Sequence, residues 1–442
     1  MRIAIVALGT LGDVAPYVAL GQGFVAAGDA VKIVTFARFA PLARQYGLEC
    51  CVVKRNLEAF LERDFTRFHV TARSVMQALR RMPQIRQEMQ KQLEYLMSHC
   101  LEAFADVDLV IGQAIGHLAA WPLAQQLNIP YYAAYCAPLS RTRAFPNAFA
   151  GDIFPPGPGW RRWKGSYNWW THTLSARLFW ARMSPMLRKA LQAVLKQPAG
   201  ALNPGVPVLY GYSPALLPKP ADWGAHIAVT GSWQLKQLED WQPPSELVTF
   251  LDAGPPPVYV GFGSMAGQAQ KKAVHLSVQA LQALRMRCVL MADRAAWPEL
   301  HDCADIFFLP SAPHSWLFPR MAAIMHHGGA GTTATALRAG LPQIIVPFIA
   351  DQSFWGHLVA ISGIGPAPLQ HKTMQLEHVR DAIVQAVTDP QMRLRARNLS
   401  ETVHSEDGVA RAVEIVHAFM RTLKSEELPT LPAWRHMKPV CW

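Results

Sequence analysis

Short apolar segments that alternate with helical segments constrain the fold of this chain most. In the first half, the apolar runs are 3–8, 31–36, 109–112 and 130–134. The main helical segments between them are 14–27 and 73–104. Strand–helix alternation at this spacing predicts a parallel sheet with helices on both faces. The first run imitates a short signal peptide, but no convincing cleavage site follows it. We therefore interpret it as a buried first strand.

The second half repeats this style. Its predicted strands are 257–261, 288–292, 306–309, 321–325 and 343–348. Its predicted helices are 271–285 and 332–339. Pro243-Pro244 and Gly254-Pro255-Pro256-Pro257 mark a linker between the halves. A chain of 442 residues is long enough for two such units. The sequence thus predicts two doubly wound α/β domains. Their boundaries are 1–232 for the first domain, 233–257 for the linker, 258–407 for the second domain and 408–442 for the last segment.

The most specific motif is His326-His327-Gly328-Gly329-Ala330-Gly331-Thr332-Thr333, which lies between a predicted strand and a predicted helix. Glycines allow the backbone to approach an anion, and a helix N-terminus offers free N–H groups with a partial positive charge. The histidine and threonine side chains add donors and positive potential. The motif therefore predicts a metal-free diphosphate site. It is neither a Walker loop nor a G-x-G-x-x-G fingerprint. The alternative is a glycine-rich turn with a capping threonine.

Three further polar groups follow predicted strands. Asp351 and Gln352 could bind neighbouring sugar hydroxyls, or could simply cap a loop. Ser264, in a Gly-Phe-Gly-Ser turn, could bind a phosphate. Asp13 follows the first strand, where it could act as a general base or cap a helix, and spacing alone favours the cap.

Composition excludes several classes of protein. Hydrophobic residues make up 51% of the chain and charged residues 17%, which excludes a disordered solvating protein. The seven cysteines form no C-x-x-C pair and the 16 histidines no H-E-x-x-H motif, so we expect no disulfide framework and no metal site. A reducing cytoplasm fits this cysteine usage. No run reaches 18 apolar residues, so we expect no membrane-spanning helix.

The net positive charge is confined to the first half. Residues 1–220 hold 24 Lys and Arg against 12 Asp and Glu, whereas residues 221–442 hold 18 against 19. Segment 160–189 adds five of the 14 tryptophans and seven cations: Trp160, Trp163, Trp169, Trp170, Trp180, Arg161, Arg162, Lys164, Arg177, Arg182, Arg188 and Lys189. This mixture is typical of an interfacial helix or an apolar substrate mouth. The alternative is a helix that packs its tryptophans inward.

Two stretches resemble a known family. The run GTLGDVAPYVALG at 9–21 resembles the N-terminal signature of inverting GT-B glycosyltransferases, which use nucleotide-diphosphate sugars. Residues 327–352, within a wider stretch from 314 to 366, resemble the donor-binding signature of that family. Pro347-Phe348 before Asp351-Gln352, together with the motifs at 210–214, 218–223 and 230–233, is most similar to sterol glucosyltransferases. Bacterial antibiotic and rhamnolipid glycosyltransferases are related, and the resemblance covers most of 1–425.

The resemblance implies a role for each matching residue. Asp13 would deprotonate the acceptor hydroxyl, and Asp351 and Gln352 would bind the sugar. The groups assigned to the diphosphate are Ser264, His327, Gly331 and Thr332, whereas Ser311 and Ala312 would lie beside the uracil. Donor binding also includes Gly329 and Thr333. The helix near 408–423 would return to the first domain. Leu11 and Ala15 depart from the family pattern beside the acceptor, so the acceptor-binding residues remain unassigned.

The expected activity is transfer of a hexose, with glucose from UDP-glucose as the expected donor, to a hydroxyl of a sterol, lipid or polyketide-like acceptor. We expect no cofactor and a cytoplasmic protein that contacts an anionic membrane peripherally. One alternative is a sugar-nucleotide epimerase of the same fold, which would not need the tryptophan-rich segment. Another is a basic nucleic-acid-binding protein, which would not explain residues 326–333, so we expect no nucleic-acid partner.

Overall fold

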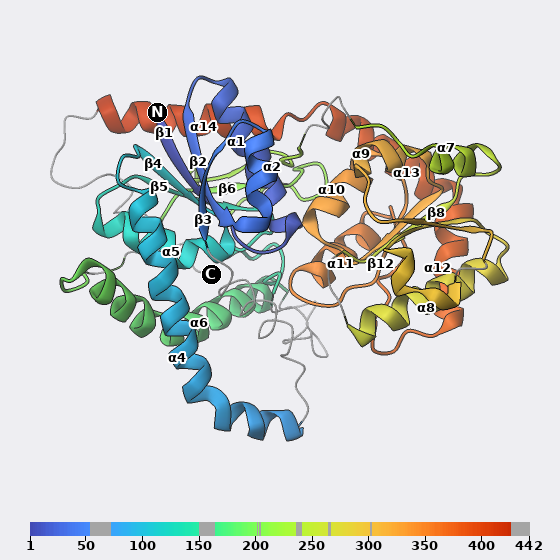
Figure 1. Cartoon of the computed structure of the whole chain (residues 1–442), viewed down its shortest axis with the longest axis horizontal. Helices are drawn as coiled ribbons and strands as arrows, with labels where there is room; N and C mark the ends of the chain where they lie inside the picture. The colour runs from blue at the N-terminus through green and yellow to red at the C-terminus, as the bar shows by residue number, and fades with distance from the viewer. Residues whose placement is uncertain are drawn as a thin grey trace.

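The computed structural model describes residues 1–53, 72–149, 164–200, 202, 205–235, 241–263, 267–300 and 303–425, except for the side chains of 72–85 and 424–425. Two α/β units lie side by side, each built on a parallel sheet between helices (Figure 1). The predicted doubly wound architecture is therefore confirmed.

The first unit contains seven parallel strands in the order β3-β2-β1-β4-β5-β6-β7. The strands are β1 (Arg2–Val6), β2 (Ala30–Phe36), β3 (Glu49–Val53), β4 (Leu109–Gly112), β5 (Tyr131–Tyr135), β6 (Val208–Tyr210) and β7 (Ile227–Val229). The helices are α1 (Leu11–Ala26), α2 (Ala40–Gln45), α4 (Ala72–Ala103), α5 (Ala114–Gln126) and α6 (Lys164–Leu195). The sequence analysis missed β3, β6 and β7. Strands β6 and β7 have three residues each, which are too few to show a periodicity.

The second unit contains five parallel strands in the order β10-β9-β8-β11-β12. They are β8 (Val258–Gly261), β9 (Cys288–Met291), β10 (Ile306–Leu309), β11 (Ala323–His326) and β12 (Gln343–Ile345). The helices are α7 (Ser245–Asp252), α8 (Gln268–Ala283), α9 (His314–Leu317), α10 (Ala330–Arg338), α11 (Gln352–Ile361), α12 (Leu376–Thr388) and α13 (Pro390–His404). Short 3-10 turns occur at Ala37–Phe39, Arg294–Ala296, Pro298–Leu300 and Phe318–Arg320.

Three boundaries in this unit differ from the expectation. Strand β12 ends before Phe348, since Pro347 has no N–H to continue the ladder. Helix α10 begins two residues before Thr332, so Ala330 and Gly331 form its first turn. Helix α7 lies inside the segment predicted to be a linker.

The two units share a continuous core. One cluster of buried side chains includes Trp355 and Ile345 of the second unit together with residues of the first sheet. Aromatic pairs cross the boundary, with ring centroids 5.4 Å apart for Phe145 and Phe354 and 5.7 Å for Tyr212 and Trp355. The boundary is therefore well packed, and side chains from both units meet there.

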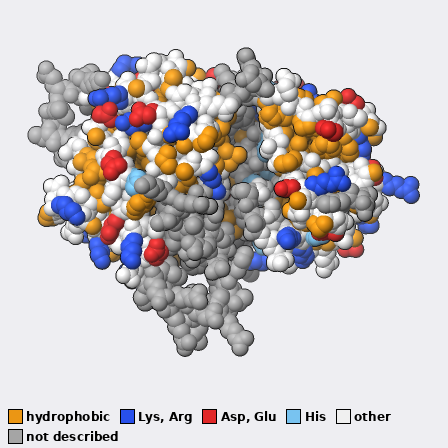
Figure 2. Space-filling view, in the orientation of Figure 1, with side chains coloured by type: hydrophobic (Ala, Val, Ile, Leu, Met, Phe, Trp, Pro, Cys, Tyr) orange, Lys and Arg blue, Asp and Glu red, His pale blue; other side chains and the backbone are white. Residues whose placement is uncertain are grey.

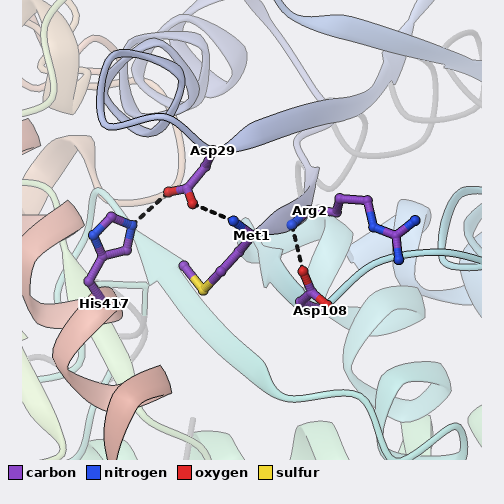
Figure 3. A network of polar contacts seen from close by, with 5 residues as sticks. All are labelled: Met1, Arg2, Asp29, Asp108 and His417. Carbon is purple, nitrogen blue, oxygen red and sulfur yellow. Dashed lines mark hydrogen bonds and ion pairs between the residues drawn. The ribbon is translucent and has the colours of Figure 1, made fainter. Parts of the chain in front are cut away.

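Helix α14 (Gly408–Ser425) returns to the first unit and packs on α1 (Figure 1). The helices approach closely at Gly23, where a Cβ atom would lie 2.2 Å from a Val409 methyl group. Half-buried Asp29 joins α14 to the N-terminus of the chain, because it accepts hydrogen bonds from His417 Nε2 at 2.6 Å and from the Met1 ammonium at 2.7 Å (Figure 3).

Two expectations drawn from composition concern the chain as a whole. Within the residues that the structure describes, no helix is both long and apolar enough to cross a membrane. Cys50, Cys51, Cys100, Cys136, Cys288 and Cys303 are free thiols, whereas Cys441 lies outside the described residues.

Candidate active site between the two units

Two strand–turn–helix junctions meet where the units adjoin. In the first sheet the strand order reverses between β1 and β4, and in the second it reverses between β8 and β11. In open parallel sheets, ligands bind beyond the carboxyl ends of the strands at such points. Strand β1 leads into α1 and strand β11 leads into α10, and these two helices contact each other. The site is therefore expected at this contact.

His326 fixes the turn after β11. Its Nδ1 accepts a hydrogen bond from the Gly328 N–H at 3.1 Å, so Nε2 carries the proton and donates to Gln343 Oε1 at 3.0 Å. Burial lowers the pKa of His326 to about 3, which keeps the ring neutral. Gly328 has a φ of +88°, and a Cβ atom there would lie 2.8 Å from an Ile345 methyl group. This histidine and this glycine shape the turn itself.

The N-terminus of α10 is open. Its N-cap, Gly329, has no side chain to cap the helix, and a Cβ atom there would lie 2.4 Å from His327 Nε2. The first intrahelical bond shown runs from Thr333 N–H to Gly329 O at 2.9 Å. The preceding N–H groups, on Ala330, Gly331 and Thr332, therefore have no partner within the helix.

Gly331 differs from its neighbours because the fold does not require it. No described atom lies within 4 Å of the position of a Cβ atom, and the residue is exposed. Glycine in a helix costs stability relative to alanine, typically about 1 kcal/mol. The open space above Gly331 is where a ligand could approach the helix N-terminus.

Two buried polar atoms beside this helix end lack partners among the described residues. They are His327 Nδ1 and Thr333 Oγ1, and Thr333 as a whole is buried. Buried polar atoms are usually hydrogen-bonded, so both indicate a site built for a polar ligand. Burial lowers the pKa of His327 to about 4. Burial thus favours the neutral ring, which offers an N–H group as a hydrogen-bond donor, and the role of His327 toward a diphosphate stays a prediction.

Asp13 occupies the third position of α1, the helix that contacts α10. Its Oδ2 accepts hydrogen bonds from the Thr10 N–H and the Thr10 hydroxyl, both at 2.8 Å. Gly9, with a φ of +128°, leaves room for that carboxylate, because a Cβ atom there would lie 2.5 Å from Oδ2. Burial raises the pKa of Asp13, and the bonds from Thr10 oppose the rise. One carboxylate oxygen thus caps the helix, and the described residues leave Oδ1 without a hydrogen bond.

Asp351 lies across the boundary from Asp13. It follows Ala350, a non-glycine residue with a φ of +57°, and its Oδ2 accepts a hydrogen bond from Trp355 Nε1 at 2.8 Å. Burial raises the pKa of Asp351 to about 6, and the charge of Asp13 raises it further. Strained backbone of this kind often marks functional sites. Because the charge of Asp13 affects the pKa of Asp351, the two carboxylates are close enough to interact, although they belong to different units.

The other predicted residues differ in what the structure shows. Gln352 Oε1 accepts hydrogen bonds from the N–H groups of Phe348 and Ile349 at 2.8 and 3.1 Å, so this side chain orders the loop before Asp351. Ser311 is exposed and Ala312 half-buried, just before α9. Ser264 lies outside the described residues.

Sequence reasoning assigned no role to His314 or Trp355. His314 Nε2 lies 3.1 Å from the Tyr259 hydroxyl, and the ring is near enough for His327 to contribute to its lowered pKa, although burial is the main cause. Trp355 could have been found, since residues four apart on a helix are neighbours and Asp351 precedes it by four. No local pattern in the sequence predicts that His314 lies beside His327.

Comparison with known proteins agrees with this geometry. Residues 3–146 match the model of the glycosyltransferase family 28 N-terminal domain. Residues 278–419 match the erythromycin biosynthesis protein CIII-like C-terminal domain. The two halves of the chain thus match two different glycosyltransferase domain models, and the fold is GT-B.

Relatives of this GT-B chain include fungal sterol 3-beta-glucosyltransferases. The Aspergillus terreus protein is 32% identical over 441 residues, and the Cryptococcus neoformans protein is 31% identical over 458 residues. Each alignment covers 96% of this chain but only 30% and 27% of the respective relative. The chain thus spans less than a third of the length of these relatives.

Solved structures share the GT-B fold at low identity. The calicheamicin glycosyltransferase CalG4 superposes with a TM-score of 0.64 at 18% identity, covering 97% of this chain and 99% of CalG4. The spinosyn rhamnosyltransferase SpnG, complexed with thymidine diphosphate, superposes with a TM-score of 0.61 at 18% identity, covering 94% of this chain and 100% of SpnG.

Proposed function

We propose that this protein transfers glucose from UDP-glucose to the hydroxyl group of a sterol or similar lipid-like alcohol, with inversion at the anomeric carbon. The observation that supports the proposal best is the uncapped N-terminus of α10, because α10 contacts α1, the helix that carries Asp13. The fungal relatives named sterol 3-beta-glucosyltransferase support glucose as the sugar and a sterol as the acceptor class.

In this proposal the diphosphate of the donor occupies the open end of α10. The N–H groups of the first turn, the Thr333 hydroxyl and the His327 ring would donate hydrogen bonds to it. The helix adds the equivalent of roughly half a positive charge at its N-terminus. Preorganised donors of this kind stabilise a departing diphosphate. The predicted contacts of Ser264 with phosphate and of Ser311 and Ala312 with uracil remain part of the proposal.

The sugar would then lie between the two carboxylates. Ionised Asp351 can accept hydrogen bonds from sugar hydroxyls, because Trp355 holds only its Oδ2. The acceptor oxygen attacks the anomeric carbon from the side opposite the diphosphate. As the new C–O bond forms, the bond to the diphosphate oxygen breaks and its electron pair leaves with UDP. Asp13 takes the acceptor proton, and the burial that raises its pKa makes it a stronger base.

The proposal assigns no metal to the step. Among the described side chains, no group of three His, Cys, Asp or Glu residues could hold a metal ion. The helix N-terminus and its neighbouring donors would stabilise the leaving group instead. Activity should therefore survive EDTA. Loss of turnover in EDTA, with recovery on adding Mg²⁺, would contradict this part.

The decisive experiment is a panel of sugar nucleotides with a sterol and with a polyphenol as acceptors, read by mass spectrometry and by NMR of the product. We expect one hexose to be added to the sterol from UDP-glucose, with a β-configured product. TDP-glucose is the essential comparison, since SpnG is known with thymidine diphosphate. Preference for TDP-glucose would overturn the nucleotide assignment, and an α-configured product would overturn inversion. An altered donor sugar without transfer would favour the epimerase alternative.

A further inference from the structure

Helix α6 carries an outward face of mixed apolar and cationic side chains. Trp170, Leu174 and Leu178 are 60%, 38% and 47% exposed, and they are spaced four residues apart. Side chains at this spacing form a line along one side of a helix. Large apolar groups exposed in a continuous line indicate a surface that is covered in use.

Cations flank this line on both sides. Arg177, Arg182 and Arg188 are exposed, and the 32 residues of α6 include no Asp or Glu. At about 100° per residue, the three apolar and three arginine side chains fall within one arc of roughly 140°. We call these six residues the α6 outward face. The opposite side of α6 is buried against neighbouring helices, including α4 and α5, through residues such as Leu187 and Leu191.

The structure describes three tryptophans of segment 160–189, and they differ in which way they face. Trp180 packs on Trp121 with ring centroids 5.4 Å apart, and Trp169 lies under the Arg141 guanidinium at 3.8 Å. These two follow the inward-packing alternative, whereas Trp170 points outward. Trp160, Arg161, Arg162 and Trp163 lie outside the described residues.

A short path of contacts connects the buried side of α6 to the candidate site. The loop before the helix packs on it, with the Asn147 N–H donating to Thr171 Oγ1 at 2.9 Å and His172 Nε2 donating to Phe145 O at 3.1 Å. The Phe145 ring contacts Phe354, which adjoins the tryptophan that holds Asp351. Phe149, at the end of the same loop, is 43% exposed. An apolar acceptor arriving at this face would thus lie near the boundary between the units.

We propose that the α6 outward face docks on the surface of an anionic lipid bilayer. The net charge of the helix and of residues 1–220 complements an anionic leaflet. Figure 2 shows hydrophobic, Lys/Arg and Asp/Glu side chains together on the surface of the N-terminal lobe. Interfacial helices bury apolar side chains at the headgroup boundary and place cations beside the phosphates. The purpose of docking, delivery of a lipid acceptor, rests on the proposed function, but the docking itself does not.

Sedimentation of the full chain with vesicles tests the proposal without any sugar donor. Binding should be strong to phosphatidylcholine vesicles containing phosphatidylglycerol at low salt, weak to phosphatidylcholine alone, and reduced at high salt. Each cation near an anionic leaflet contributes roughly fivefold to partitioning, so R177Q/R182Q/R188Q should lower it on the order of 100-fold. The variant W170S/L174S/L178S should lower binding at every salt concentration.

Matched variants on the second unit serve as controls. K271Q/K272Q/R393Q removes the same charge, and I361S/V384S/L394S removes three exposed apolar side chains, so neither should change vesicle binding. Failure of the wild-type chain to bind anionic vesicles at low salt would overturn the proposal, as would equal losses in test and control variants. A dimer in solution that W170S/L174S/L178S dissociates would also overturn it and assign the face to a second copy. Glucosylation of a water-soluble sterol analogue, measured separately, reports on the proposed function alone.

Discussion

The β1–α1 and β11–α10 junctions follow the same plan and differ in one decisive position. Both pass from a buried strand through a glycine turn into a helix, and both have glycine at the second helical position, Gly12 and Gly331. The third position is Asp13 in α1 and Thr332 in α10. In α1 the carboxylate folds back onto Thr10 at the N-cap, whereas the N-cap of α10 is a glycine that no side chain caps.

This difference shows how one backbone arrangement can serve opposite purposes. A helix N-terminus attracts negative charge. In α1 the chain supplies that charge itself, because Oδ2 of Asp13 caps the helix, while Oδ1 has no hydrogen bond from the described residues. In α10 the charge must come from a ligand, which fits an anionic leaving group. The site therefore pairs a closed junction with an open one, and four predictions test this contrast.

The largest effect is expected from D13N, which removes the proposed proton acceptor of the closed junction. The Asn oxygen can still accept from Thr10, so the fold should persist. Loss of a general base typically costs on the order of 10²–10⁴ in rate. We expect kcat to fall by that range while calorimetry shows unchanged UDP affinity and the melting temperature stays within a few degrees. Wild-type turnover in a folded D13N protein would show that Asp13 is only a cap.

T332D should convert the open junction into a copy of the closed one. A carboxylate at the third position would stabilise the helix and repel a diphosphate, so UDP affinity should fall on the order of 100-fold while the melting temperature holds or rises. T335D is the control, because it adds the same charge one turn farther along α10. Equal losses in both variants would mean that net charge, and not the helix N-terminus, governs donor binding.

Alanine at the two second-position glycines should separate stability from binding. Neither site is crowded, since a Cβ atom at Gly12 would lie 3.7 Å from the Thr10 hydroxyl and one at Gly331 meets no described atom within 4 Å. Both G12A and G331A should therefore stabilise the protein by up to about 1 kcal/mol. We expect only G331A to weaken UDP binding, about tenfold, because its methyl group would occupy the ligand's approach. Isothermal titration with UDP and thermal melting distinguish the two variants, and unchanged UDP affinity in G331A would leave that glycine unexplained.

The smallest effect concerns the stability cost of the second carboxylate, Asp351. Its folded pKa of about 6 exceeds the ordinary value of 3.8, so the folded state binds the proton more tightly. Stability is thus lost as pH rises through this range, and the charged form is disfavoured at pH 7. D351N should raise the free energy of unfolding by on the order of 1 kcal/mol at pH 7.5 and by less at pH 5, in urea titrations. Transfer from the sugar nucleotide should fall while UDP affinity barely changes. D381N, at an exposed carboxylate, should change neither; a gain in stability that is independent of pH would contradict the assignment.

Local pattern determined much of this protein. Strand–helix alternation predicted both sheets, and the order of residues in 326–333 placed a glycine turn at a helix start. Residues that are close together in the sequence control these features, so the features can be predicted without knowing the fold. The same locality explains the errors, since three-residue strands such as β6 carry no period and the start of α10 depends on where its first hydrogen bond forms.

Only the tertiary structure decided how these pieces act together. Spacing left Asp13 as either a cap or a base, and the fold shows that one oxygen caps the helix while the other has no hydrogen bond from the described residues. The approach of Asp351 to Asp13, and of His314 to His327, requires elements that are far apart in sequence to pack together. The sequence likewise placed five tryptophans in one segment, but packing turned Trp180 inward and left Trp170 exposed. Burial depends on which other element packs against each face of a helix, and the tertiary fold of the whole chain determines that packing.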